Sequence, residues 1–420
     1  MKYLHGFSLN SIAVGLAFSL GLVNQSLLAR QLGTEAYGTL SLWVTTVMIA
    51  GLLVGEWFNR GATYTVGRLG DRGPAVRLGL RCGLAAVVLV PLALQAVGPA
   101  HLPLPGLSRF HVGLLAALIV LGVMQKAGEA ILLGEDRIGL YSAVPVLFIS
   151  LWLLGNLVVL KGLHLGSNGV LWSWLAAVGG TALAVWLMLV PGASVRDHLE
   201  RQTVRDTASV GLRAAASAVL VLLLFRVNFY LVEAFLGAGS LGVFRVAVIF
   251  ADMMQRVPNI AGVVLLPKVI SGDDRAGQDV FSMQVALAVL AFSLVAAAVI
   301  FTVGKWMILL VFSAEYEGAF TPLVWLLPGL ILAGAGSVLN TRLAGLGYPP
   351  ATYVAPALAL AANVALNLVL IPSRGLAGAA LATSISYGIW VGLIAVAFAR
   401  HLRRTGTDWR AAFAPPWDRS

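Results

Sequence analysis

Three ionisable residues lie deep inside apolar stretches of this chain. Arg226, Asp252 and Arg256 belong to the stretch 226–268, which has two membrane-length apolar segments joined by a short glycine-rich turn. An ionised side chain at the centre of a bilayer costs about 2.5–3.5 kcal/mol even on lenient insertion scales. We therefore expect these groups to face protein or water, not lipid.

Their spacing supports a shared polar face. Arg245, Ile249, Asp252 and Arg256 follow one another at helical spacing, and Asp252 and Arg256 are four residues apart, where side chains on a helix can touch. Arg226 lies in the preceding segment. Two neighbouring helices with polar stripes indicate a wet cleft inside a membrane protein. The alternative is a set of interhelical ion pairs that only fix packing.

Other polar groups inside predicted spans extend this picture. Glu56 and Arg60 are four residues apart, Lys126 and Glu129 are three apart, and Asn24 lies in the first apolar run. One interpretation is a cationic cleft that opens to the cytoplasm, with carboxylates that tune it or bind a coupling ion. The other is a set of satisfied pairs at the membrane edge, where snorkelling is cheap, with Asn24 bridging helices.

Composition bounds the class of protein. The 420 residues are 59% hydrophobic and 11% charged, with a mean hydropathy of +0.90, whereas a soluble domain carries about 25% charged residues. The single Cys82 excludes an intramolecular disulfide. The sequence contains no catalytic, metal-binding or ATP-binding motif, so we predict neither an enzyme nor a metal or cofactor site. The apolar run 9–29 is interpreted as a retained first span.

Apolar windows predict an all-α polytopic membrane protein with about twelve transmembrane helices. Each window can cross about 30 Å of hydrocarbon, and they cover residues 9–29, 39–60, 78–98, 112–133, 140–160, 169–190, 209–236, 241–266, 281–304, 320–341, 351–371 and 376–398. With both termini in the cytoplasm, 19 Lys and Arg residues lie inside, 5 outside and 4 within the membrane. This bias explains the net charge of +10 without nucleic acid, and the basic face suits anionic membrane lipids.

An internal repeat divides the chain into halves. Leu32-Gly33 aligns with Leu236-Gly237, Asn156 aligns with Asn367, and Gly166 aligns with Gly375. The predicted domains are an N-terminal six-helix bundle (1–190), a cytoplasmic linker (191–207), a C-terminal six-helix bundle (208–400) and a cytoplasmic tail (401–420). Two halves of six spans have the same orientation, which predicts a pseudo-twofold axis along the membrane normal with a substrate site between the bundles.

Four stretches resemble the polysaccharide flippases, which move lipid-linked oligosaccharides in bacteria. They are LLARQLGTEAYGTLSL (27–42), LLFRVNFYLVEAFLGAGSLGVFRVA (223–247), VFSAEYEGAFTPLVWLLPG (311–329) and NVALNLVLIPSRGLAGAALATSISYG (363–388). The last is particularly similar to the family pattern. This family belongs to the multidrug/oligosaccharidyl-lipid/polysaccharide exporter superfamily, whose members include the peptidoglycan-precursor flippase and the multidrug and toxin extruders.

The resemblance implies two six-helix bundles around a V-shaped central cavity that opens alternately to each side of a bacterial inner membrane. It also implies a polyprenyl-pyrophosphate-linked glycan as substrate, a proton or sodium ion as coupling ion, and association with polysaccharide assembly proteins. Arg60 and Arg256 match places of the family's cavity cations. Asn228 stands where the family pattern often has an acid, which puts a carboxylate ion site at that helix in doubt.

Residue spacing and the family resemblance both predict a cationic site. Arginine is the best holder of a pyrophosphate, so Arg256, Arg226 and Arg60 are predicted to grip it. The full predicted set adds Lys126, Arg245 and Asn24 for substrate binding, and Asp252, Glu56 and Glu129 for charge tuning or ion coupling. Three alternatives remain: a cation-coupled multidrug and toxin extruder, a membrane polysaccharide polymerase or ligase, and a membrane scaffold that transports nothing.

Overall fold

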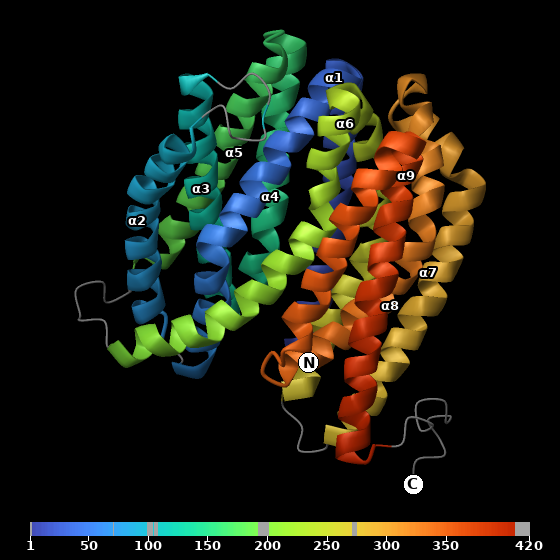
Figure 1. The fold of residues 1–420 in the computed structure, drawn as a ribbon. Coiled ribbons are helices and arrows are strands. Elements are labelled where there is room, and N and C mark those ends of the chain that lie inside the picture. Colours follow the sequence, from blue (N-terminus) through green and yellow to red (C-terminus); the bar gives the residue numbers. More distant parts are fainter. Residues whose placement is uncertain are drawn as a thin grey trace. The chain divides into compact units, whose positions relative to one another are not determined.

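The computed structural model describes residues 2–69, 71–98, 104, 108–191, 201–270 and 275–407, which form nine α-helices and no strand. Figure 1 shows their course. Their bounds are α1 Lys2–Leu69, α2 Gly73–Val97, α3 Arg109–Gly134, α4 Ile138–Leu157, α5 Gly166–Leu189, α6 Arg201–Ile270, α7 Arg275–Val311, α8 Phe320–Gly345 and α9 Ala351–Thr405. A π-helical turn, Val158–Gly162, extends α4, and a 3₁₀ turn, Ala314–Ala319, precedes α8.

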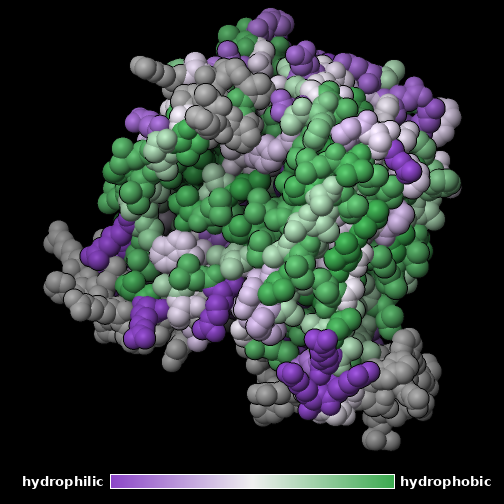
Figure 2. Space-filling model, in the orientation of Figure 1, coloured by the Kyte–Doolittle hydropathy of each residue, from purple (hydrophilic) through white to green (hydrophobic). Residues whose placement is uncertain are grey.

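Nine helices in the described ranges are long and apolar enough to cross a membrane. Large apolar side chains on their outer faces are exposed, among them Leu84 on α2 and both Trp306 and Leu310 on α7. Figure 2 shows hydrophobic residues along the middle of the helices and hydrophilic residues gathered toward their ends. Such a surface suits hydrocarbon, so the chain is an all-α, multi-pass membrane protein.

Three of these helices break at a glycine. The backbone leaves helical geometry at Gly33 (φ 74°, ψ 174°) in α1, at Gly237 (φ 80°, ψ 170°) in α6 and at Gly375 (φ 57°, ψ −137°) in α9. Side chains other than hydrogen rarely tolerate such angles. An unbroken helix of 68 residues, the length of α1, would be about 100 Å long, over three times the hydrocarbon thickness.

These breaks reconcile nine helices with twelve predicted spans. Each break divides one helix into two pieces, so the nine described helices comprise twelve helical segments, which follow the predicted windows closely. The sequence predicted short turns at these places. The structure replaces each turn by one glycine between two helices, because a single residue with positive φ is enough to end one helix and start the next.

The contacts divide the chain into two compact units, residues 1–219 and 220–420. The border lies inside α6, whose first turns pack within the first unit. Thr207 on α6 hydrogen-bonds Thr65 on α1 at 2.8 Å, and a Cβ atom at Gly211 would lie only 1.8 Å from the carbonyl oxygen of Trp57. The predicted domain borders, the twofold axis and the V-shaped cavity stay predictions. Residues 192–200 of the predicted linker and 408–420 of the predicted tail lie outside the described residues.

Each unit has its own apolar core. In the first unit Phe58, Val76, Ile131 and Trp186 bring α1, α2, α3 and α5 together. In the second unit Val289 of α7 and Val338 of α8 belong to a smaller cluster. The first core holds α1 and α3, and the second holds α7 and α8, and each of these four helices carries polar residues described below.

Candidate functional site

The second unit holds two arginines that share one carboxylate. Arg226 Nη2 donates to both carboxylate oxygens of Asp252, at 2.9 and 3.0 Å, and Arg245 Nη1 donates to Asp252 Oδ2 at 3.5 Å. We call these three residues the arginine–aspartate cluster. Its formal charge is +1, because two cations face one anion. The cluster can therefore attract an anion.

The break at Gly237 is what brings the cluster together. Arg226 precedes the break in α6, whereas Arg245 and Asp252 follow it. The ring of Phe229 contacts both guanidinium groups, with its centre 5.7 Å from Cζ of Arg226 and 5.9 Å from Cζ of Arg245. Cation–π contacts of this kind help to hold the two cations in place.

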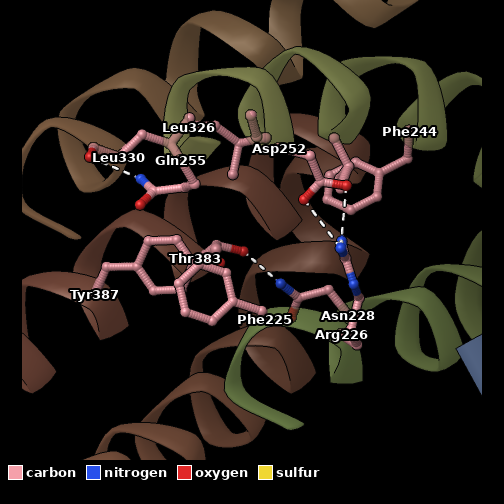
Figure 3. Close-up of a pocket in the computed structure, with 12 residues that line it drawn as sticks. Phe225, Arg226, Asn228, Phe244, Asp252, Gln255, Leu326, Leu330, Thr383 and Tyr387 are labelled. Carbon is pink, nitrogen blue, oxygen red and sulfur yellow. Dashed lines mark hydrogen bonds and ion pairs between the residues drawn. The ribbon is translucent and has the colours of Figure 1, made fainter. Parts of the chain in front are cut away.

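A small cavity adjoins the cluster (Figure 3). Phe225, Asn228, Gln255 and Tyr387 are among its lining residues, and it offers about 20 Å³ of space for water, enough for about one molecule. Gln255 donates to the carbonyl oxygen of Leu330 on α8 at 3.1 Å, which ties α6 to α8 beside the cavity. A space for about one water molecule thus lies beside Arg226 and Asp252. The wet cleft expected around these residues stays a prediction.

Arg256 lies one helical turn beyond Asp252 on α6, and its side chain is exposed. The sequence offered Arg256 as the helical partner of Asp252. In the structure Asp252 contacts Arg226 and Arg245, which the sequence had not paired with it.

The first unit carries the other predicted cations as two separate pairs. Arg60 Nε donates to Glu56 Oε1 at 2.7 Å on α1, and Lys126 Nζ donates to Glu129 Oε2 at 2.6 Å on α3. Both carboxylates are buried, whereas the side chains of Arg60 and Lys126 are 55% and 59% exposed. The Thr63 hydroxyl bonds the carbonyl oxygen of Ala130, so α1 and α3 are joined next to both pairs. Because Arg60 and Lys126 are exposed while their carboxylate partners are buried, each cation can also bind an anion from solution.

Asn24 belongs to a buried hydrogen-bonded network. It is fully buried, and its Oδ1 accepts from Asn156 Nδ2 at 2.9 Å, while Ser173 donates to Asn156. The network joins α1, α4 and α5, which is the helix-bridging role that the sequence left open for Asn24. Its predicted substrate-binding role stays a prediction.

The second unit repeats this network at aligned positions. Asn367 on α9 donates to Asn228 Oδ1 on α6 at 2.8 Å, and Asn228 donates to Thr383. Asn367 is the residue that the internal repeat aligns with Asn156. The two halves therefore share a polar network as well as sequence, and Asn228 is engaged as a neutral amide.

The second unit also contains a buried ion cluster that the sequence did not predict. Asp279 on α7 accepts from Arg342 Nε on α8 at 2.7 Å and contacts His401 Nε2 on α9 at 3.1 Å. The side chains of Asp279 and Arg342 are 0% and 2% exposed. Arg342 is one of the 19 Lys and Arg residues that the sequence predicts on the cytoplasmic side, and Asp279 is not among the predicted site residues. A signal was present, since Asp279, Arg342 and His401 all lie within a few residues of the same-side ends of predicted spans. Among the residues with described side chains, no group of three or more His, Cys, Asp or Glu could hold a metal ion.

Neither protein-family models nor curated proteins match this chain. Solved structures do. An inward-facing multidrug resistance MATE family transporter of the MOP superfamily matches with a TM-score of 0.71 at 15% identity, over 94% of this chain and 98% of that one. The lipid II flippase MurJ, in an inward closed conformation, matches with a TM-score of 0.73 at 16% identity, over 93% and 87%.

A third structure, a mutant form of the Vibrio cholerae MATE transporter VcmN, matches with a TM-score of 0.65 at 16% identity, over 98% of both chains. These matched proteins are transporters by name, not enzymes. At such identities the likeness establishes architecture. The chain is a multi-pass membrane protein with the fold of MOP superfamily transporters.

Proposed function

We propose that this chain flips a polyprenyl-pyrophosphate-linked oligosaccharide from the cytoplasmic to the outer leaflet of a bacterial inner membrane, by alternating access, for polysaccharide biosynthesis and export. Both termini would be cytoplasmic, and polysaccharide assembly proteins would receive the product. The sequence resemblance to polysaccharide flippases supports the substrate class, and the MurJ-like fold supports flipping.

The arginine–aspartate cluster carries the proposal. A flippase for this substrate has to hold a pyrophosphate within the membrane, and two arginines around one carboxylate leave a positive charge for it. Guanidinium groups bind phosphate oxygens in a fork that lysine cannot provide. Arg256 and Arg60 supply further exposed cations, with Lys126 as a point charge. Asn24 is left out of this proposal because it is fully buried.

Three carboxylates would couple transport to an ion gradient. Asp252, Glu56 and Glu129 each contact a cation of the proposed site. Taking up a proton or a sodium ion would weaken the hold of each carboxylate on its cation, and so change the affinity for the anionic substrate. An ion gradient could thereby drive release on one side of the membrane.

The proposal predicts that Arg256→Ala and Arg60→Ala each lower flipping by about tenfold, because each removes an exposed cation that would hydrogen-bond the pyrophosphate, and a hydrogen bond to a charged group contributes about 1.5–3 kcal/mol. The measurement is complementation of a flippase-deficient strain, with protein levels checked. Arg404→Ala, at the exposed end of α9, is the matched control and should transport normally. Normal transport by both Arg256→Ala and Arg60→Ala would show that the assignment is wrong.

A cation-coupled multidrug extruder is the second candidate, favoured by the likeness to MATE transporters. Its substrates are expected to be small cations, which the net positive cluster would repel. Drug-sensitivity profiles of cells with and without the chain separate the two functions. Resistance conferred by the wild-type chain and retained by Arg226→Leu would favour the extruder.

A further inference from the structure

The two arginines of the cluster are placed independently of the carboxylate between them. Arg226 and Arg245 each lie against the Phe229 ring, and Phe229 itself is buried. The ring comes from the same helix segment as Arg226. The guanidinium groups can therefore keep their positions when Asp252 is exchanged for another anion.

Asp252 is the most exposed member of the cluster. Its side chain is 33% exposed, whereas those of Arg226 and Arg245 are each 15% exposed. Solvent and solutes therefore have more access to Asp252 than to either arginine. Arg256 lies one turn further along α6, within the usual reach of a residue four positions away, and can face the carboxylate once it turns aside.

The cavity beside the cluster is too small for a phosphate next to Asp252. Its space of about 20 Å³ admits about one water molecule, and a phosphate group has five heavy atoms. Figure 3 shows the Asp252 carboxylate directed at Arg226. A phosphate can therefore take the position between the two guanidinium groups only if the carboxylate leaves that position.

We propose that Asp252 is a built-in competing anion: it occupies the anion position between Arg226 and Arg245, and a phosphate or pyrophosphate group displaces it. Asp252 is then a specificity-determining residue. A pyrophosphate carries more negative charge than a carboxylate and offers more acceptors to the two guanidinium forks, so it can replace Asp252, whereas a singly charged or neutral ligand cannot. This inference rests on the proposed function for the identity of the natural ligand.

The test is binding of inorganic pyrophosphate to the purified full-length protein in lipid nanodiscs, measured by calorimetry. Asp252→Asn should bind pyrophosphate about tenfold or more tightly than the wild type, because the competing charge is gone while the side-chain shape is kept. Glu317→Gln removes an exposed carboxylate paired with Lys305 at 2.7 Å, outside the cluster, and should bind like the wild type. Unchanged or weaker binding by Asp252→Asn overturns the proposal.

Asp252→Ser provides a second variant with a small neutral side chain and should show the same tightening. If both variants unfold even with pyrophosphate present, the proposal also fails, because displacement requires the helices to hold once the carboxylate has left. Nanodiscs loaded with polyprenyl pyrophosphate form the second arm of the experiment. If Asp252→Asn binds both polyprenyl pyrophosphate and inorganic pyrophosphate more tightly than the wild type, the site is assigned to lipid headgroups. If it binds only inorganic pyrophosphate more tightly, the site is assigned to free phosphates.

The outcomes separate this inference from the proposed function. If Arg226→Gln weakens pyrophosphate binding while Asp252→Asn leaves it unchanged, the proposal that pyrophosphate displaces Asp252 is wrong, but the proposed substrate site is retained. If Asp252→Asn binds pyrophosphate more tightly while the wild type transports no polyprenyl pyrophosphate, the proposal that pyrophosphate displaces Asp252 is retained and the proposed function is wrong.

Discussion

Arg342→Leu is expected to destabilise the protein by about 3–5 kcal/mol, the usual cost of breaking a buried ion pair by removing one partner. The substitution leaves the fully buried Asp279 carboxylate without the guanidinium that donates to it at 2.7 Å. His401 alone would remain, at 3.1 Å. The measurement is thermal or denaturant unfolding of the purified protein in detergent.

Lys305→Leu is the control for this variant. It breaks an ion pair of similar length, to Glu317 at 2.7 Å, but both side chains are about half exposed, and exposed pairs contribute only about 0–1 kcal/mol. The double variant Asp279→Leu/Arg342→Leu should recover much of the lost stability, since it leaves no buried charge behind. Equal stability of Arg342→Leu and Lys305→Leu would contradict the buried cluster.

Asn367→Leu and Asn156→Leu are expected to lower stability by similar amounts, about 1–3 kcal/mol each. Asn367→Leu leaves Asn228 Oδ1 without its donor, and Asn156→Leu does the same to Asn24 Oδ1. All four amides are fully or almost fully buried, so water cannot replace the lost bonds. Unfolding of the two variants, measured side by side, tests the structural repeat as well as the energetics.

Ser373→Ala is the matched control on α9. The Ser373 hydroxyl is exposed and donates to the carbonyl oxygen of Val369 in its own helix, so its loss should change stability by less than about 0.5 kcal/mol. A harmless Asn156→Leu beside a damaging Asn367→Leu would show that the two networks are not equivalent.

The sequence predicted the helical segments well because hydrocarbon thickness imposes a length that hydropathy reveals. It also identified Leu32-Gly33 and Leu236-Gly237 as repeated, and the structure gives Gly33 and Gly237 nearly the same backbone angles. The sequence could not show that one helix runs up to each glycine and another starts directly after it. Turn length depends on backbone angles at one residue, which hydropathy does not register.

The contacts among the predicted site residues were found only in part, for a related reason, and their role as a site stays a prediction. Helical spacing finds contacts within one helix, such as Glu56 with Arg60 and Lys126 with Glu129, and the structure contains both. The contact of Asp252 with Arg226 crosses the break at Gly237 and depends on how two segments pack. Spacing alone cannot supply such a contact.

The cluster of Asp279, Arg342 and His401 was not predicted for the same reason. Asp279, Arg342 and His401 come from α7, α8 and α9 and meet only because three helix ends lie together. Each residue alone resembles a membrane-edge charge in the sequence, so its burial depends on tertiary structure.

The most direct test of the central claim, that Arg226 and its neighbours hold a pyrophosphate within the membrane, is reconstituted flipping. Proteoliposomes would carry a fluorescent polyprenyl-pyrophosphate-linked oligosaccharide, and access of an external glycosidase would report the leaflet. The wild type should move the lipid, and folded Arg226→Leu should do so about a hundredfold more slowly, because one partner of a partly buried, hydrogen-bonded charge pair is lost. Equal initial rates for the two proteins, or no movement of this lipid by the wild type, would contradict the account.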